Sequence, residues 1–287
     1  MERHLPEDVD PIEAKRGEML AVNREQRQYY EKATGANESV ANSGATNIWR
    51  RAGRRVFGAL AAAGVHDSIR ELHRGWLGDI SHRHLLDLGV GDGNLLSLDL
   101  ARRAGRYTAI DLSQSRIDRY REKLAEAGIR GVELHAVDFL SPDFQGGDYD
   151  VIYAMAVLHH FKHPDALLEV LHQRLGTSGQ VVTYDPLAVW LPARLARAAY
   201  RPFQTDRAWE FPFTRQTLQV IQKYFNIVQV QGFYGRSKWA ALASVASKDL
   251  AARLARRWHA HDMSQATSLD RLGSCMHISL LLTKRGA

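Results

Sequence analysis

The stretch His84-Leu-Leu-Asp-Leu-Gly-Val-Gly-Asp-Gly-Asn94 joins a short apolar run to three glycines spaced two residues apart. Its leucines suit a buried β-strand, while Gly89, Gly91 and Gly93 let the chain turn sharply and approach a ligand where a side chain would clash. A helix should follow from about Asn94 to Ala104, with its first amide groups directed at the loop. The stretch therefore predicts a strand, a ligand-binding loop and a helix.

The glycine spacing separates this loop from the dinucleotide-binding fingerprint G-x-G-x-x-G. The third glycine comes one residue early, and the loop carries Asp92, whose carboxylate would repel a diphosphate. A carboxylate is tolerated or favourable beside an ammonium group. The loop therefore favours an amino-acid-like ligand over a nicotinamide dinucleotide.

Acidic residues close the strands that we expect next. A strand over 106–111 ends at Asp111, a strand over 132–137 precedes Asp138, and further strands are expected over 149–154 and 180–185. Asp111 follows the glycines by about twenty residues, the spacing at which an acid at the end of the second strand binds a ribose diol. Because the carboxyl ends of parallel strands lie at one edge of a sheet, we expect one crevice there.

With these motifs, roughly residues 80 to 190 resemble the class I S-adenosylmethionine-dependent methyltransferases. The resemblance is to the small-molecule branch, which includes ubiquinone and menaquinone biosynthesis enzymes and natural-product methyltransferases. It implies an α/β, Rossmann-like fold with a seven-stranded, mostly parallel sheet, an antiparallel last strand over 277–283, and S-adenosyl-L-methionine as the cofactor. The cofactor residues that it implies are Asp87, Gly89, Gly91 and Gly93 for the methionine part, Asp111 and Leu112 at the ribose, Asp138 and Phe139 at the adenine, and Ala154 and Met155 after the fourth strand.

Residues 1–80 are expected to be helical and to cap a core formed by residues 81–287. One helix is expected over 11–34, a turn-rich connection over 35–44, and a second helix over 47–63. The resemblance implies that the first helix folds over the cofactor as a lid, which would place Tyr30 or Tyr29 against it; equally, both rings anchor the helix on the core. The second helix carries four arginines, Arg50, Arg51, Arg54 and Arg55. Either one of them pairs with the cofactor carboxylate or all of them form a basic surface that faces solvent.

Two insertions, over about 186–213 and 234–275, are rich in aromatic residues and arginine. In the second we expect much of the chain from Lys238 to Trp258 to be helical. Variable loops at the carboxyl edge of such a sheet often carry function, so we expect the insertions to build the substrate side. Their composition suits an apolar, aromatic or lipid-like small molecule, with arginines available for an anionic group on it.

The candidate catalytic residues are His159 and His160, which follow the fourth strand and are expected at the start of a helix. A helix N-terminus disfavours the imidazolium, so a histidine there would stay neutral and able to accept a proton. A structural role for either histidine is the alternative.

The sequence favours O-methylation of a small, largely apolar metabolite of specialised metabolism, with N- or C-methylation as the alternative. No Asn/Asp-Pro-Pro-aromatic motif follows the fourth strand, which argues against methylation of a nucleic-acid base. An RNA or protein methyltransferase is supported only by the net charge of +6 and the pI of about 9.5, and a cofactor-binding scaffold without catalysis is less favoured.

The single cysteine, Cys275, excludes an internal disulfide, and no histidine spacing indicates a metal site. The longest apolar runs are too short to span a bilayer, and the first residues lack the apolar core of a signal peptide. We therefore expect a cytoplasmic protein without a transmembrane segment, leaving peripheral contact with a membrane open. The sequence carries no signal for an oligomeric state.

Overall fold

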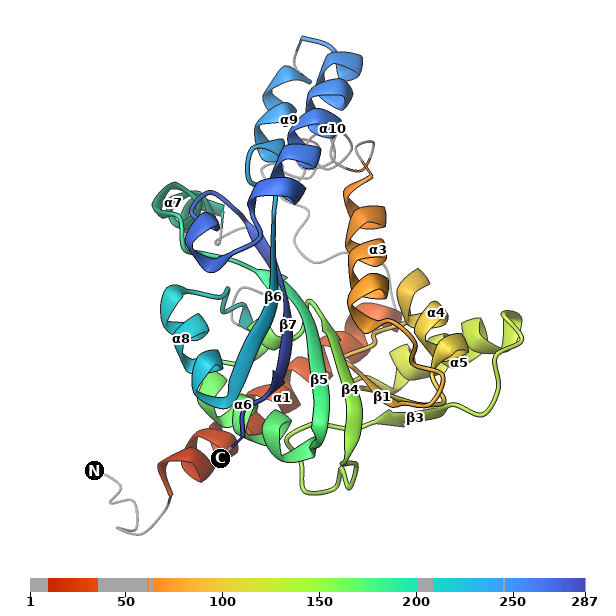
Figure 1. Cartoon of the computed structure of the whole chain (residues 1–287). Helices are drawn as coiled ribbons and strands as arrows, with labels where there is room; N and C mark the ends of the chain where they lie inside the picture. The colour runs from red at the N-terminus through yellow and green to blue at the C-terminus, as the bar shows by residue number, and fades with distance from the viewer. Residues whose placement is uncertain (1–9, 36–60, 62–63, 201–208, 245, 287) are drawn as a thin grey trace.

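A computed structural model describes residues 10–35, 61, 64–200, 209–244 and 246–286 (Figure 1). Most of the expected connection over 35–44, nearly all of the helix expected over 47–63 and the insertion residues 201–208 lie outside the described residues. So do the four arginines Arg50, Arg51, Arg54 and Arg55.

A seven-stranded sheet with strand order β3-β2-β1-β4-β5-β7-β6 forms the centre of the molecule. The strands are β1 (His84–Leu88), β2 (Arg106–Asp111), β3 (Glu133–Ala136), β4 (Tyr149–Met155), β5 (Leu175–Pro186), β6 (Phe225–Phe233) and β7 (His277–Lys284). Strand β7 runs antiparallel to both of its neighbours, whereas the pairs from β3 to β5 are parallel. The predicted fold class, with its antiparallel last strand, is confirmed.

Helices cover both faces of the sheet because its central strands carry apolar side chains on both sides (Figure 1). On β1, Leu86 and Leu88 pack in one core with α6 (Pro164–Arg174) and α8 (Arg215–Tyr224). Leu85 packs in a second core with α3 (Val65–Leu77), α4 (Leu95–Arg103) and α5 (Gln114–Glu126). Each face of the sheet therefore has its own apolar layer.

The expected strand, loop and helix at the start of the sheet are confirmed. Helix α4 begins directly after Asn94, whose side-chain oxygen accepts hydrogen bonds from the amides of Leu96 at 2.8 Å and Ser97 at 3.1 Å. Such a cap satisfies two of the amide groups that a helix leaves unpaired at its N-terminus. The end of the glycine loop is thereby fixed.

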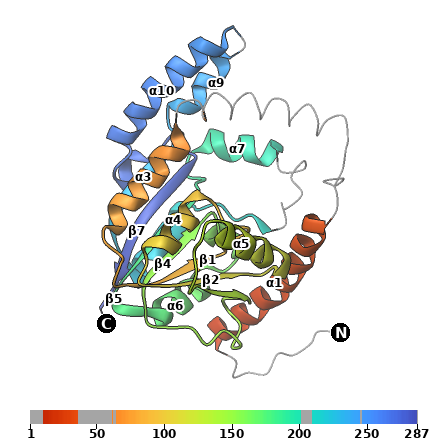
Figure 2. The same ribbon diagram turned by 90° about the vertical axis from the view of Figure 1, so that its right-hand side faces the viewer.

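The second insertion is largely helical between Lys238 and Trp258, as expected, but it is divided into separate helices. The chain forms a 3-10 turn, η4 (Ser237–Trp239), a short helix, α9 (Ala240–Ala243), and then α10 (Lys248–Gln265). Ser247 has extended backbone angles and its hydroxyl accepts from the Leu250 amide at 3.3 Å, so it caps a new helix instead of continuing the old one. In the first insertion, α7 (Leu191–Tyr200) follows β5 (Figure 2).

Helix α3 carries a fully buried imidazole against the sheet. The Nδ1 of His73 lies 3.1 Å from the hydroxyl of Tyr153, and its Nε2 lies 2.7 Å from the hydroxyl of Ser279. Burial lowers the pKa of His73 to about 3, so the ring is neutral in the fold.

Among the residues that the structure describes, no helix combines the length and the apolar character needed to span a bilayer.

Candidate active site

The glycine loop between β1 and α4 has a left-handed backbone at Gly89, Gly91 and Gly93, with φ of 67°, 59° and 70°. A Cβ atom on Gly93 would lie 2.0 Å from the ring of Tyr120, and one on Gly89 would lie 2.6 Å from Val157. Side chains are therefore excluded at both positions by backbone strain and by contact.

Asp87 lies beneath this loop and does not line the cavity described below. Its carboxylate accepts a hydrogen bond of 2.7 Å from the hydroxyl of Tyr107, which lies 2.9 Å from the hydroxyl of Tyr120. Burial raises the pKa of Asp87 to about 6. The Tyr120 ring also packs against Gly93, where a side chain would otherwise lie. The hydrogen-bonded residues Asp87, Tyr107 and Tyr120 therefore support the glycine loop.

A cavity of about 100 Å³ lies at the carboxyl ends of β1, β2 and β3. Seven of the predicted site residues line it: Gly89, Asp111, Leu112, Asp138, Phe139, Tyr30 and His160. Six do not line it: Asp87, Gly91, Gly93, Ala154, Met155 and His159. The cavity also has lining residues that the sequence reasoning missed: Asn23, Gln26, Arg116, Ala156, Val157 and Phe161.

The two acids at the strand ends are buried and hydrogen-bonded. Asp111 accepts from the amides of Gly91 at 2.9 Å and Ser113 at 3.0 Å, which ties the glycine loop to the end of β2. Asp138 accepts from the Leu140 amide at 2.9 Å and from the side chain of Asn23. Burial raises the pKa of both carboxyls above the ordinary value of an aspartate.

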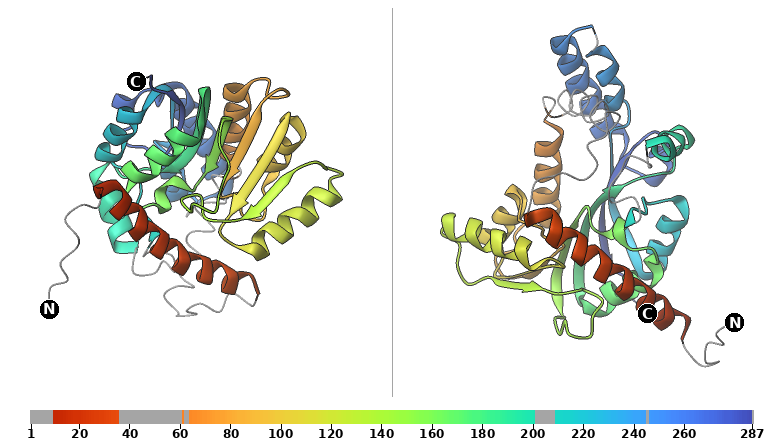
Figure 3. Two further views of the ribbon diagram at one scale, coloured as in Figure 1. Left: turned by 90° about the horizontal axis from the view of Figure 1, so that it is seen from below. Right: turned by 180° about the vertical axis from the view of Figure 1, so that it is seen from behind.

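Helix α1 (Pro11–Gly35) supplies one wall of the cavity and lies across the ends of β2 and β3. Arg27 donates to the carbonyl oxygens of Leu112 at 2.8 Å and Ala136 at 3.3 Å. Figure 3 shows α1 crossing the molecule between α6 and α5. The sequence identifies this helix but not its course over the sheet, which is why Asn23 and Gln26 were missed.

The two tyrosines of α1 have different surroundings. Tyr30 lines the cavity, and the guanidinium of Arg116 lies 4.2 Å from the centre of its ring. Tyr29 packs edge-on against Tyr30 and against Trp209 of the first insertion, with ring centres 5.4 Å and 5.3 Å apart. Tyr30 thus faces the cavity, while Tyr29 contacts the insertion.

Asp92 is absent from the cavity lining, although the loop chemistry suggested that it lies beside a ligand ammonium group. Its carboxylate is half exposed and lies 3.6 Å from the Nζ of Lys123 and 3.8 Å from the Nε of Arg119. Helix α5 therefore provides the cations that balance this acid.

The histidine pair lies in a single 3-10 turn, η1 (Leu158–His160), and α6 begins only at Pro164. The expectation that the pair starts a regular helix is therefore wrong, and a helix dipole does not act on it. His159 is buried, and its Nδ1 lies 2.9 Å from the carboxylate of Asp185 on β5. Since an ionised carboxylate only accepts, Nδ1 carries the proton.

His160 stacks on His159, with ring centres 4.1 Å apart, and lines the cavity. Its Nδ1 lies 3.0 Å from the carbonyl oxygen of Trp209. A carbonyl oxygen accepts only, so in the neutral ring the lone pair lies on Nε2. The two imidazoles are thus held by different partners, and one of them reaches the cavity.

The donors and acceptors in the cavity lining suit the nucleoside part of a ligand. Gly89 lets the loop approach the cavity closely, and Asp111 and Asp138 provide acceptors for hydroxyl and amino groups. The side-chain nitrogen of Gln26 is buried without a hydrogen-bond partner among the described residues, which indicates a missing acceptor.

A family model described as a methyltransferase domain matches residues 85–179. These residues contain the glycine loop, both acids and the histidine pair. Residues 85–179 therefore form a methyltransferase domain. S-adenosyl-L-methionine is the cofactor that the resemblance implies for such a domain.

Relatives of the methyltransferase domain differ in the atom that their names say is methylated. The chain is similar to a phosphatidylethanolamine N-methyltransferase of Cereibacter sphaeroides, at 29% identity over 45% of this chain and 64% of that one. It is also similar to a ubiquinone biosynthesis O-methyltransferase of Xanthomonas euvesicatoria, at 29% identity over 36% of this chain and 43% of that one. The matched region thus spans less than two thirds of either relative.

The fold is shared with a geranyl diphosphate C-methyltransferase from Streptomyces coelicolor, whose structure contains S-adenosyl-L-homocysteine. The TM-score is 0.54 at 14% identity, covering 76% of this chain and 77% of that one. At this identity the similarity concerns the fold alone.

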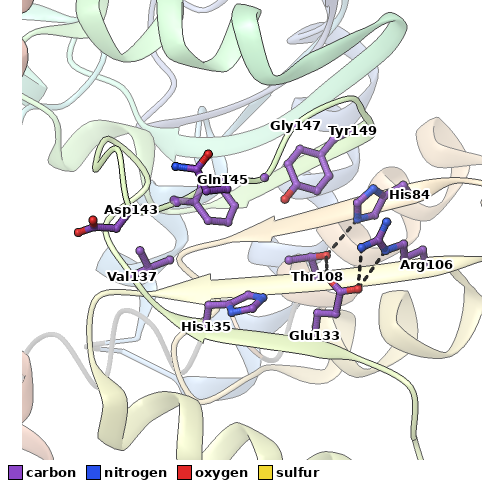
Figure 4. A pocket seen from close by; sticks show the side chains of 12 residues that line it. His84, Arg106, Thr108, Glu133, His135, Val137, Asp143, Gln145, Gly147 and Tyr149 are labelled. Carbon is purple, nitrogen blue, oxygen red and sulfur yellow. Dashed lines mark hydrogen bonds and ion pairs between the residues drawn. The ribbon is translucent and has the colours of Figure 1, made fainter.

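A second cavity, of about 450 Å³, lies against the amino-terminal halves of β1 and β2 and along β3 (Figure 4). Thr108 links His84 at 3.0 Å to Glu133 at 3.2 Å, and Arg106 donates to Glu133 at 2.8 Å. Arg106 and Glu133 begin strands β2 and β3, whose other ends border the cavity of about 100 Å³, so these two side chains lie away from that cavity.

Within the described residues, no cluster of three or more His, Cys, Asp or Glu side chains is arranged to hold a metal ion.

Proposed function

We propose that the protein methylates an oxygen atom of a small, largely apolar metabolite of specialised metabolism. The observation that carries this proposal is the position of His160 in the wall of the cavity that also contains Asp111 and Asp138. Its bond to the Trp209 carbonyl places the ring proton on Nδ1, so Nε2 is the nitrogen that would accept the proton of a hydroxyl group.

S-adenosyl-L-methionine, when bound, would supply a methyl group attached to a sulfonium. Its sulfur is a good leaving group because it becomes a neutral thioether and needs no proton. The chain's own residues therefore have to align the acceptor, exclude water and accept the hydroxyl proton. In this proposal His160 accepts that proton. His159, fixed by Asp185, supports the ring of His160 from behind.

Helix α1 is proposed to be the lid of the cofactor site, because Asn23, Gln26 and Tyr30 reach the cavity from it. The two insertions are proposed to bind the acceptor. They expose large apolar side chains at Leu191, Leu195, Trp239 and Leu242, and Lys238 lies 4.4 Å from the ring of Trp190. Such a surface suits an apolar molecule that carries an anionic group.

N-methylation of an amine is the second candidate. It is favoured by the match to the phosphatidylethanolamine N-methyltransferase, which covers more of this chain than the match to the O-methyltransferase. Charge on the amine, instead of a hydroxyl proton, would then determine the pH dependence of the reaction.

The test is incubation of the protein with cofactor carrying a ¹³C-methyl group and a metabolite extract of its source. Carbon NMR of the labelled product separates O-methyl, N-methyl and C-methyl groups, and we expect an O-methyl signal. A label on nitrogen or carbon would contradict the proposal.

The role of His160 is tested by the variant His160→Gln. It should reduce turnover at least about tenfold while retaining affinity for S-adenosyl-L-homocysteine. Unchanged turnover would show that His160 is not the base.

A further inference from the structure

Helix α1 presents polar side chains at positions where a docked helix normally buries apolar ones. Met19, Asn23, Gln26 and Tyr30 are spaced by four, three and four residues, so they share one face of the helix. Asn23 is 4% exposed and Gln26 is 2% exposed. Two carboxamides are therefore buried between α1 and the sheet.

Asn23 has a partner that accounts for its burial. Its Nδ2 donates to both carboxylate oxygens of Asp138, at 3.1 Å and 3.0 Å. Asp138 also accepts from the Leu140 amide, and a carboxylate has room for about four donors. It therefore keeps capacity for a donor from a ligand.

Gln26 has no comparable hydrogen-bond partner among the described residues. Its Nε2 is buried, and none of the described residues provides a hydrogen-bond partner for it. The residue lines the cavity together with Asp111, Asp138 and Tyr30. Because a buried donor without an acceptor lowers stability, its retention at a cavity wall points to an acceptor that belongs to a ligand.

The docked position of α1 leaves too little room for the cofactor. The cavity measures about 100 Å³, whereas sites for ligands of comparable size are about 300 Å³ or larger. Polar contacts hold much of the helix, including Glu18 with Lys162 and His163, and Lys15 with Asp165. Of its described residues only Met19 is a fully buried apolar side chain. An outward movement of the helix would expose Met19 and the partly buried Ile12 and Leu20, while breaking mainly polar contacts.

We propose that Gln26 is a cofactor-binding residue whose Nε2 donates a hydrogen bond to an acceptor atom on the nucleoside half of the cofactor. This rests on the proposed function only through the cofactor and the role of α1 as its lid. The nucleoside half is indicated because Asn23, one turn before Gln26, bonds Asp138, and because Asp111 lines the same cavity. The ionised acids only accept hydrogen bonds, so Gln26 adds the donor that a ribose oxygen or an adenine ring nitrogen requires.

The proposal is tested by titration calorimetry of the full chain with S-adenosyl-L-homocysteine and with adenosine. Gln26→Leu should weaken binding of both ligands about tenfold, the loss expected for one buried hydrogen bond. Gln26→Glu, which places a third carboxylate near Asp111 and Asp138, should weaken binding further. Gln28→Leu, on the exposed side of the same helix, is the matched control and should bind as the wild type does.

Thermal unfolding without ligand separates a binding role from a structural one. Gln26→Leu should unfold at the same temperature as the wild type or higher, because an apolar group replaces a donor that lacks a partner. Unchanged affinity in Gln26→Leu, with the wild type binding, would overturn the proposal alone. Weaker binding together with a lower unfolding temperature would also overturn it, since the variant would then act through helix packing. A wild type that binds neither ligand would instead overturn the proposed function.

Discussion

The Nδ1 of His159 lies 2.9 Å from the carboxylate of Asp185, and both side chains are buried. The same carboxylate oxygen accepts from the His159 amide at 3.1 Å, and the other accepts from the hydroxyl of Thr183. Asp185 therefore fixes both the backbone and the ring of His159. Because the ring of His160 stacks on that of His159, the carboxylate at the end of β5 orients a group in the cavity wall without touching the cavity itself.

Asp185→Asn should lower turnover about tenfold or more, because the amide cannot stabilise the His159 ring as a carboxylate does. Affinity for S-adenosyl-L-homocysteine should remain near that of the wild type, since Asp185 does not line the cavity. Turnover, its pH profile and calorimetric affinity are the measurements. A lower unfolding temperature with wild-type turnover would show that Asp185 is only structural.

Gly93→Ala should destabilise the protein by about 2 to 4 kcal/mol, the sum of strain at positive φ and of contact with the Tyr120 ring. Gly91→Ala is the matched control: its φ is also positive, but the nearest atom to the new Cβ is 3.8 Å away. We expect a loss of about 1 kcal/mol there. Urea unfolding measures both variants, and equal losses would show that the Tyr120 contact does not matter.

The dependence of stability on pH should reveal two buried groups that act in opposite directions. The pKa of His73 is lowered to about 3, so stability that is present above the unfolded value of 6.5 is lost as pH falls toward 3. The pKa of Asp87 is raised to about 6, so its contribution is present below 3.8 and is lost as pH rises through 6. Between about pH 4 and 6 the two contributions offset one another.

Single variants should separate the two contributions. Relative to the wild type, His73→Gln should change the slope of unfolding free energy against pH by about −1.4 kcal/mol per unit between pH 4 and 6, and Asp87→Asn by about +1.4. Urea unfolding across this range gives the slopes. Parallel curves for all three proteins would contradict the assigned protonation states.

Amide hydrogen exchange should show that α1 opens more readily than the sheet. Its polar attachment, with Met19 as its fully buried apolar side chain, predicts that residues 19–30 exchange faster than β1 and β4. S-adenosyl-L-homocysteine should slow exchange in this segment. Equal exchange with and without bound ligand would contradict the role of α1 as a lid.

Much of the fold follows from local patterns. The apolar run before Gly89, the cap at Asn94 and the acids after the strands together predicted the parallel sheet and its crevice. Local reasoning was less successful where one hydroxyl decides a boundary. At Ser247 the extended backbone and the side-chain bond to Leu250 divide the helical region between Lys238 and Trp258, a boundary that the apolar spacing does not mark.

Cavity-lining residues were predicted from the sequence where they stand at the end of a strand or directly after it. Asp111, Asp138 and Phe139 line the cavity because their position in the sequence places them at the carboxyl edge of the sheet. The histidines were identified as a pair, but their different partners, Asp185 and the Trp209 carbonyl, come from segments 26 and 49 residues away.

The sequence by itself determined the strands and turns that end in the glycine loop and the two acids, since strand and turn preferences depend on neighbouring residues. Only the tertiary structure decided that Asn23 and Gln26 face the cavity, that Asp87 and Asp92 do not, and that His160 reaches it while His159 is held behind. The reason is that these outcomes depend on where α1, β5 and the segment at Trp209 pack, and packing between distant segments leaves no local periodic signal.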